Sequence, residues 1–312
     1  MLTVLSIIFP VFAVMGLAYV VVLKGLFDQA EIRTLGKYVL NIAFPAMLFN
    51  TVATRDLSDV FNLPYLAAYA LIGLITGAIA LVVLSAQGEG RARQAVGWIG
   101  VNSPNSAFIG FPLLSFISPE IAGTVLAMNF LVENFLLVPI GLVLLESAKG
   151  SQTSPLRLLG RTVLAVMKRP MVIALWLGLF AVLAGLHPPQ ALQRLLDFVG
   201  ASASAVALFC VGGALVGLPL RGNRGLAGQI TVGKLIVHPL IAIAVLSIPV
   251  LALAPALQVA MILSAALPML SLYTVLVQGT GEEGVASLAM LWANIGSVVT
   301  VTALLWWLQT AA

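Results

Sequence analysis

Ten long apolar runs, almost free of charged residues, constrain the fold of this chain more than any other feature. They fall at residues 3–23, 36–53, 64–85, 94–117, 121–145, 166–186, 198–219, 229–251, 255–278 and 286–308. A helix that crosses a bilayer needs about 20 mostly apolar residues, which is close to the length of each run. Only 8% of the 312 residues are charged, compared with about 25% in soluble domains. We therefore expect an all-α integral membrane protein of ten transmembrane helices, spans 1 to 10 in chain order.

The positively charged residues predict which side of the membrane each loop faces, because Lys and Arg accumulate in cytoplasmic loops. Only Arg55 and Arg194 lie in loops on one side, and Lys234 falls inside span 8. The other twelve of the 15 Lys and Arg residues flank the loops after spans 1, 3, 5 and 7: Lys24, Arg33, Lys37, Arg91, Arg93, Lys149, Arg157, Arg161, Lys168, Arg169, Arg221 and Arg224. We expect that second side to be cytoplasmic and both termini to lie outside.

The spans divide into two groups of five, which indicates an internal repeat. A cytoplasmic linker would separate the two five-helix repeats, giving the segments 1–147, 148–169 and 170–312. Because five is odd, the second repeat enters the membrane with the opposite orientation, as in transporters with inverted repeats. A shift of about 164 residues places Pro104 on Pro268 and Asn129 one residue from Asn294, which supports the inverted repeat.

Two predicted spans carry a proline near the middle of the bilayer, Pro104 in span 4 and Pro268 in span 9. Proline breaks the helical hydrogen-bond ladder, and the freed backbone groups must meet protein, water or substrate. Each new helix start carries about half a positive charge, so two converging starts would bind an anion such as a carboxylate. An ordinary kink repaired by neighbouring helices is the alternative. The predicted substrate-binding residues are Asn102, Pro104, Asn105, Ser106, Pro268 and Ser271.

Ionisable residues inside the predicted spans are few, and such residues are costly in lipid unless they are paired. Glu133 lies near the middle of span 5, and Lys234 and His238 lie four residues apart on one face of span 8. We expect Glu133 to have a partner on another helix, with Lys234 and His238 as the candidates. The predicted residues for ion or proton coupling, or for gating, are Glu133, Lys234, His238, Asn129 and Asn294. The alternatives are a static charge pair, a Lys234 that reaches water at the membrane surface, and a neutral hydrogen-bonding His238.

Several other kinds of site and partner are not expected. The chain has two histidines and one cysteine, too few for a histidine- or cysteine-based metal site. Basic residues in a membrane protein mostly set its orientation, so we expect no nucleic-acid partner. No arrangement of nucleophile and base indicates an enzyme, and we expect no cofactor.

The run Pro104-Asn105-Ser106-Ala-Phe-Ile-Gly110-Phe-Pro112-Leu-Leu resembles the fourth-span signature of the auxin efflux carrier family. Leu40-Asn41-Ile-Ala-Phe44-Pro45 and Lys234-Leu-Ile-Val-His238-Pro239 also resemble this family, and the likeness covers the whole chain. The short middle loop is similar to that of bacterial members, which implies a multi-pass protein of the bacterial inner (plasma) membrane.

The resemblance implies a fold related to the bile acid sodium symporters, with broken spans 4 and 9 crossing at the substrate site. Spans 1, 2, 6 and 7 would form a scaffold and a homodimer interface, and spans 3–5 and 8–10 a mobile transport domain. Asn105 would face the substrate carboxylate. One departure concerns span 9, in which no asparagine answers Asn105 after Pro268.

The resulting hypothesis is a secondary active transporter of small organic anions that works by elevator-type alternating access. The implied substrates are carboxylates or dicarboxylates such as malonate and malate, or auxin-like acids, with H⁺ rather than Na⁺ as the coupling ion. One alternative is a sodium-coupled symporter of bile-acid-type anions. Another, of a different class, is a membrane sensor that binds an anion without moving it.

Overall fold

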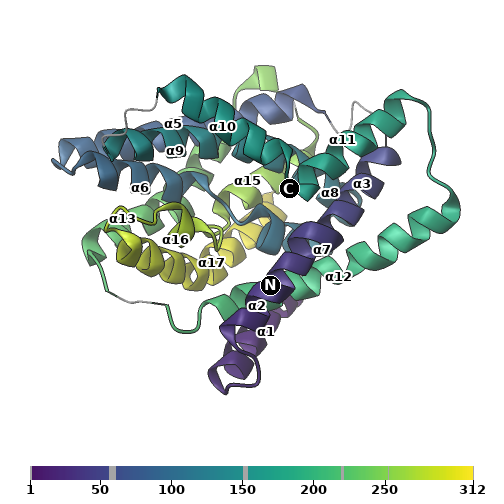
Figure 1. Cartoon of the computed structure of the whole chain (residues 1–312), viewed down its shortest axis with the longest axis horizontal. Helices are drawn as coiled ribbons and strands as arrows, with labels where there is room; N and C mark the ends of the chain where they lie inside the picture. Colours follow the sequence, from purple (N-terminus) through teal and green to yellow (C-terminus); the bar gives the residue numbers. More distant parts are fainter. Residues whose placement is uncertain (1, 56–60, 150–153, 219–220, 252, 312) are drawn as a thin grey trace.

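The computed structural model describes residues 2–55, 61–149, 154–218, 221–251 and 253–311, and within these ranges every regular element is a helix (Figure 1). Six helices are long and apolar enough to cross a membrane, or seven if one bent pair counts as a span. The six are Val4–Leu23, Leu63–Ala86, Pro119–Ala148, Gln190–Ala214, Arg224–Leu246 and Glu283–Thr310. The prediction of an all-helical, multi-pass membrane protein is confirmed. The count of ten spans in two inverted repeats stays a prediction.

Three of the long helical runs contain a π-helical turn. They are α2 (Gln29–Tyr38), η1 (Val39–Ala43) and α3 (Phe44–Ala53); α8 (Pro119–Val132), η3 (Glu133–Leu137) and α9 (Val138–Ala148); and α13 (Arg224–Val232), η4 (Gly233–Val237) and α14 (His238–Leu246). In each run a proline is the second residue after the π-turn. A proline ring clashes with the carbonyl group of the preceding turn, and the wider π-turn relieves that clash. The turns also hold Glu133 and Lys234, in line with the frequent use of π-turns at functional sites.

Two of the predicted spans are broken. The first consists of α6 (Arg91–Asn102), η2 (Ser106–Gly110) and α7 (Phe111–Ile117). The second consists of α15 (Pro255–Ala266) and the single turn α16 (Tyr273–Leu276). The breaks lie at Pro104 and Pro268, where the sequence predicts them.

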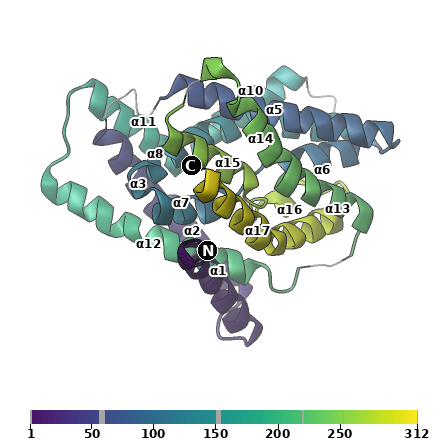
Figure 2. The same cartoon turned by 180° about the vertical axis from the view of Figure 1, so that it is seen from behind.

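The helices pack in two groups. In the first, α1 (Leu2–Leu23), α2 and α3 pack with α11 (Pro170–Leu183) and α12 (Gln190–Ala214). In the second, α5 (Leu63–Ala86), α6 and α9 pack together, α14 packs with α5 and α15, and α13 and α15 pack with α17 (Glu283–Ala311). Figure 1 shows the second group on the left, and Figure 2 shows the same grouping from behind. Whether the groups are a scaffold and a mobile transport domain is a prediction that this arrangement leaves open.

The half-helix η2–α7 lies where the two groups meet. It packs against α1 and α12 of the first group and against α8 of the second. The Phe44 ring contacts the rings of Phe108 and Phe111 edge to face, with centroids 5.9 Å apart in both pairs. The residues that follow the first break therefore contact both groups, and a movement of one group relative to the other would change these contacts.

The predicted linker at 148–169 contains a helix that the sequence analysis did not anticipate. This helix, α10 (Pro155–Met167), is followed by α11 after a bend of 71°. The segment 150–153 of the linker lies outside the described residues. Pro170 at the start of α11 explains the bend, because the residue before a proline is disfavoured in helical conformation. The remaining helical element is the short 3₁₀ turn η5 (Pro249–Leu251).

Close backbone approach joins α1 and α12. A Cβ atom placed on Gly212 would overlap the carbonyl oxygen of Met15, whereas a Cβ on Gly16 would meet no other atom within 4 Å. Only glycine lets the two helices come this near, which is the usual role of small residues between membrane helices.

We predict that Gly212→Ala lowers the free energy of unfolding by about 1–3 kcal/mol, because α1 and α12 must move apart. The measurement is the thermal unfolding midpoint of the purified protein in detergent. Gly16→Ala in α1 is the matched control and should not lower the midpoint. Equal midpoints for the two variants would contradict the close packing of α1 against α12.

Candidate functional site

The two breaks are joined by their backbones. The Asn105 amide donates to the Pro268 carbonyl oxygen over 2.9 Å, and the Leu270 amide donates to the Ser103 carbonyl oxygen over 2.8 Å. These bonds form an isolated antiparallel bridge between Pro104 and Met269. Backbone groups freed inside a membrane protein must find such partners, and here each break supplies the partners of the other.

Asn105 begins the second half of the first broken helix. Its Oδ1 atom accepts a hydrogen bond from the Phe108 amide over 3.3 Å, and its backbone carbonyl accepts from Ile109 and Gly110. The amides of Ser106 and Ala107 lie in the first turn, where a helix offers them no internal partner. This end therefore combines two donor N–H groups with the positive end of the helix dipole.

The second break does not offer an equivalent helix start. The helix after Pro268 is one turn long, α16, and the residues between Ala266 and Tyr273 are non-helical. Ser271 is only partly buried and forms no side-chain hydrogen bond with any described residue. The sequence predicted two converging helix starts. The structure has such a start at the first break, after Asn105, and no equivalent one at the second break.

Four polar side chains on or near the breaks are buried and have atoms without a hydrogen-bond partner among the described residues. The atoms are both amide atoms of Asn102, the hydroxyl of Ser103, Nδ2 of Asn105 and Oδ1 of Asn294. The first three residues are consecutive or nearly so around Pro104, and Asn294 lies on α17. Buried polar groups are almost always paired, and each unpaired one costs about 1–3 kcal/mol. Such atoms indicate a place where a ligand or water completes the structure.

Small residues on α5 make room for Asn102. A Cβ atom on Gly77 would overlap Nδ2 of Asn102, and a Cβ on Gly73 would lie 3.1 Å from its Oδ1. The Gly73-xxx-Gly77 spacing thus lets the end of α6 approach α5, with the polar amide between them.

Glu133 lies in the π-turn η3 and is bonded to two hydroxyl groups. Its Oε1 atom accepts from Tyr69 over 2.9 Å and from Ser106 over 2.5 Å. The sequence suggested Lys234 or His238 as its partner, and the structure shows hydroxyl partners instead. Ser106 is also the first residue of η2, so a change in the protonation of Glu133 would alter a hydrogen bond at the start of that half-helix.

A second cluster ties the neighbouring helices together. Asn129 donates to Ser264 on α15 over 2.9 Å and accepts from Tyr65 on α5 over 2.9 Å. Asn294 donates to the Met290 carbonyl oxygen of its own helix and has no bond to Asn129. Sequence reasoning missed Tyr65, Tyr69 and Ser264, since a tyrosine or serine in an apolar run gives no signal without knowledge of its neighbours.

Lys234 and His238 hold the carboxyl ends of both broken helices. Lys234 Nζ donates to the Ala265 carbonyl oxygen over 3.2 Å and lies 2.9 Å from His238 Nδ1. His238 Nδ1 lies 2.9 Å from the Val101 carbonyl oxygen. Val101 and Ala265 are each next to last in their helices, α6 and α15, where the helix dipole is negative. Lys234 is fully buried and does not reach water as the alternative required.

His238 Nδ1 has two neighbours that require opposite hydrogen-bonding roles, one in which it accepts and one in which it donates. A Lys234 ammonium group can only donate to it, and the Val101 carbonyl oxygen can only accept from it. One nitrogen cannot do both at once. The two contacts therefore require different tautomers of the ring, with the proton on Nδ1 for the bond to Val101 and on Nε2 for the bond from Lys234.

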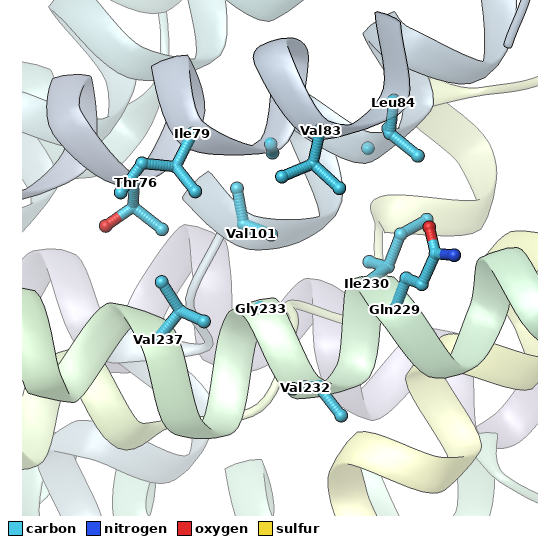
Figure 3. A pocket seen from close by; sticks show the side chains of 12 residues that line it. Thr76, Ile79, Val83, Leu84, Val101, Gln229, Ile230, Val232, Gly233 and Val237 are labelled. Atoms are coloured by element: carbon cyan, nitrogen blue, oxygen red, sulfur yellow. The ribbon is translucent and has the colours of Figure 1, made fainter. Parts of the chain in front are cut away.

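A cavity beside these residues is unsuited to an anion. It measures about 330 Å³ and is lined by α5, by Val101 and by the helical run from Gln229 to Val237. Figure 3 shows α5 above it, with Ile79 and Val83 pointing toward the opposite helix. The lining is almost entirely apolar. A charged substrate would lose its hydration there without finding donors.

The described residues contain no group of three or more His, Cys, Asp or Glu side chains placed to hold a metal ion.

Comparisons with known proteins point to one family. A family model described as "Membrane transport protein" matches residues 3–305. A Rhizobium meliloti (strain 1021) protein named "Putative malonate transporter" is 25% identical over 315 residues, which cover 98% of this chain and 96% of the relative. "Uncharacterized transporter YfdV" of Escherichia coli (strain K12) is 28% identical over 236 residues, 74% of each chain. "Lysosomal cholesterol signaling protein" of Mus musculus is 24% identical over 74% of this chain but 28% of its own length.

We predict that Lys234→Met lowers the free energy of unfolding by about 1–3 kcal/mol, because the Ala265 carbonyl oxygen loses its side-chain donor in a buried place. The thermal unfolding midpoint in detergent measures this effect. Lys149→Met is the control: Lys149 Nζ also donates to a carbonyl oxygen, that of Gln278, but at an exposed position, where such a bond contributes little. A Lys234→Met protein as stable as the parent would show that Lys234 does not hold α15.

Proposed function

The chain belongs to the membrane transport protein family, and on that premise we propose that it is a secondary active transporter of small organic anions. The resemblance to auxin efflux carriers is confirmed at the level of this family, whose members are transporters and not enzymes. We propose carboxylates and dicarboxylates such as malonate or malate as the substrates, and the name of the Rhizobium meliloti relative supports this choice.

The observation that carries the proposal is the set of unpaired buried donors at the first break. Nδ2 of Asn105 and the hydroxyl of Ser103 can donate to an oxygen atom, and Nδ2 of Asn102, which lies against Gly77 of α5, is a further unpaired donor. The first-turn amides after Asn105 add donors at the positive end of a helix. A carboxylate has only acceptors, so it fits this set. Its binding would recover the cost of leaving these groups unpaired.

Proton coupling follows from the position of Glu133. Its carboxyl group bonds to Ser106, the residue that opens the half-helix at the anion site. A charged Glu133 would repel a bound carboxylate, and a protonated one would not. We therefore propose that anion and proton bind together and cross the membrane together.

Sodium is the less favoured coupling ion. In transporters with broken helices, sodium binds to carbonyl groups at the carboxyl ends of the half-helices. Here two such carbonyl groups, of Val101 and Ala265, already have partners in His238 and Lys234. A sodium-coupled symporter of bile-acid-type anions, the alternative carrier, would need those oxygens free.

The proposed transport cycle is of the elevator type. The group of α5 to α9 and α13 to α17 would move with the crossing breaks, and the group of α1 to α3, α11 and α12 would stay fixed as the scaffold. Exposed apolar side chains on α11 and α12, such as Phe180 and Phe198, support a homodimer through the scaffold helices. We place the protein in a bacterial inner membrane with both termini outside, as the loop charges favour.

The alternative of another class is a sensor that binds the anion without moving it. The two proposals share the binding site and differ in flux. Equilibrium binding of malonate without uptake into vesicles would favour the sensor.

We predict that Asn105→Asp lowers the uptake of radiolabelled malonate into proteoliposomes by at least about tenfold, which corresponds to ~1.4 kcal/mol of lost binding free energy. Aspartate keeps the oxygen that caps Phe108 but removes the Nδ2 donor and adds a repelling charge. Asn41→Asp, at an exposed asparagine that bonds within its own helix, is the control. Unchanged uptake by Asn105→Asp would refute the proposed site.

We also predict that Glu133→Gln removes the dependence of malonate uptake on an inward proton gradient, because glutamine imitates the protonated carboxyl group. The measurement compares initial uptake rates with and without the gradient, and with sodium replaced by potassium. Glu120→Gln, at an exposed glutamate of the preceding helix α8, should keep the gradient dependence. A Glu133→Gln protein that still responds to the gradient would exclude Glu133 as the coupling residue.

A further inference from the structure

Helix α10 in the linker between the two repeats has three distinct faces. Val166 is buried, and Leu158 and Thr162 are partly buried; at 100° per residue these positions share one face. That face packs against α9 and η3. Among the other residues of α10 whose side chains are described, Val163 is partly buried and the rest are exposed.

The uncovered part begins with an apolar row. Leu156, Leu164 and Met167 have 79%, 58% and 37% of their surface exposed, and they project within about a quarter of a turn of one another. Single exposed leucines need no explanation in a membrane protein, whose lipid-facing helices are covered with them. A row of them on a helix that bends 71° away from the apolar helix α11 needs one.

A basic row runs beside the apolar row. Arg157, Arg161 and Lys168 are exposed and project within about 40° of one another. None of the three forms an ion pair with a described residue, and the sequence from 151 to 169 contains no acidic residue. Arg169, the next basic residue, is engaged elsewhere, since it donates to Asn134 over 2.6 Å.

We propose that α10 binds the surface of the bilayer and that its basic row is a site for anionic phospholipid headgroups. An apolar row flanked by Lys and Arg is the composition of helices that lie in the membrane interface. The basic row complements negative lipid phosphates, and Leu156, Leu164 and Met167 enter the acyl region below them. The charge distribution of the loops puts the linker on the cytoplasmic side, where anionic lipids attract basic segments.

The position of α10 gives such binding a route to the transport site. The helix contacts α9 and η3 of one helix group and continues into α11 of the other. At its end Arg169 bonds to Asn134, the residue after Glu133. A lipid that fixes α10 therefore also fixes the connection between the two groups. The lipid site itself does not depend on the proposed substrate or on transport.

The first test places an environment-sensitive bimane label on Leu164→Cys in the full-length protein reconstituted in phosphatidylcholine vesicles containing phosphatidylglycerol. Cys210 is buried, and labelling of the parent protein gives its background. We expect brominated lipids to quench the label and aqueous iodide to leave it bright. Quenching by iodide and not by brominated lipid would overturn the proposal.

The second test counts phosphatidylglycerol molecules retained by the detergent-purified protein in native mass spectrometry. The variant Arg157→Gln, Arg161→Gln, Lys168→Gln should lower the affinity about fivefold for each residue changed. The matched control Lys24→Gln, Arg221→Gln, Arg224→Gln removes three exposed cations on the same predicted side, outside α10. An equal loss in both variants would show general surface charge and would overturn the proposed site. If the α10 variant fails to fold, the bimane measurement still decides.

Discussion

The structure depends on two backbone hydrogen bonds that join its two broken helices. Proline prevents both segments from continuing as regular helices, and an unpaired backbone group in a membrane interior costs several kcal/mol. The pairs Asn105 with Pro268 and Leu270 with Ser103 remove part of that cost. The remaining carbonyl groups at the helix ends, of Val101 and Ala265, are held by His238 and Lys234. Each break is thus tolerable only because the other break and the π-turn of α13–α14 lie against it.

The first break also has side-chain hydrogen-bond donors that remain without a partner among the described residues. The backbone amide of Asn105 donates to the Pro268 carbonyl oxygen and its side-chain oxygen accepts from the Phe108 amide, whereas its Nδ2 atom remains unpaired. Asn102 and Ser103 add further unpaired groups next to it. Glu133 accepts a hydrogen bond from Ser106 at the same helix start. A carboxyl group that can take up a proton therefore lies beside the proposed anion site. We therefore propose that the two breaks have different roles, with substrate-binding groups at the first and structural support at the second.

The sequence predicted the features that follow from local rules. Apolar length revealed the membrane helices, and Pro104 and Pro268 revealed where two of them break. The motif around Asn105 revealed the family, which the comparisons then confirmed. What it did not predict depends on tertiary neighbours: the hydroxyl partners of Glu133, the sharing of His238 Nδ1, and the single-turn length of α16. Helix α10 was missed because the Gly-Ser-rich sequence at 150–154, before it, is typical of a loop and its own apolar residues are interrupted by arginines. The roles of the site residues remain predictions, as do the inverted repeat and the elevator motion.

The central claim is that the break at Pro104 is an anion site. An experimental structure of the protein soaked with malonate tests it most directly, because the position of a bound carboxylate needs no assumption about coupling or direction of transport. The account predicts a carboxylate within hydrogen-bonding distance of Nδ2 of Asn105 and of the amides that follow it. Malonate bound elsewhere, or a break that binds no anion at saturating concentration, would contradict it.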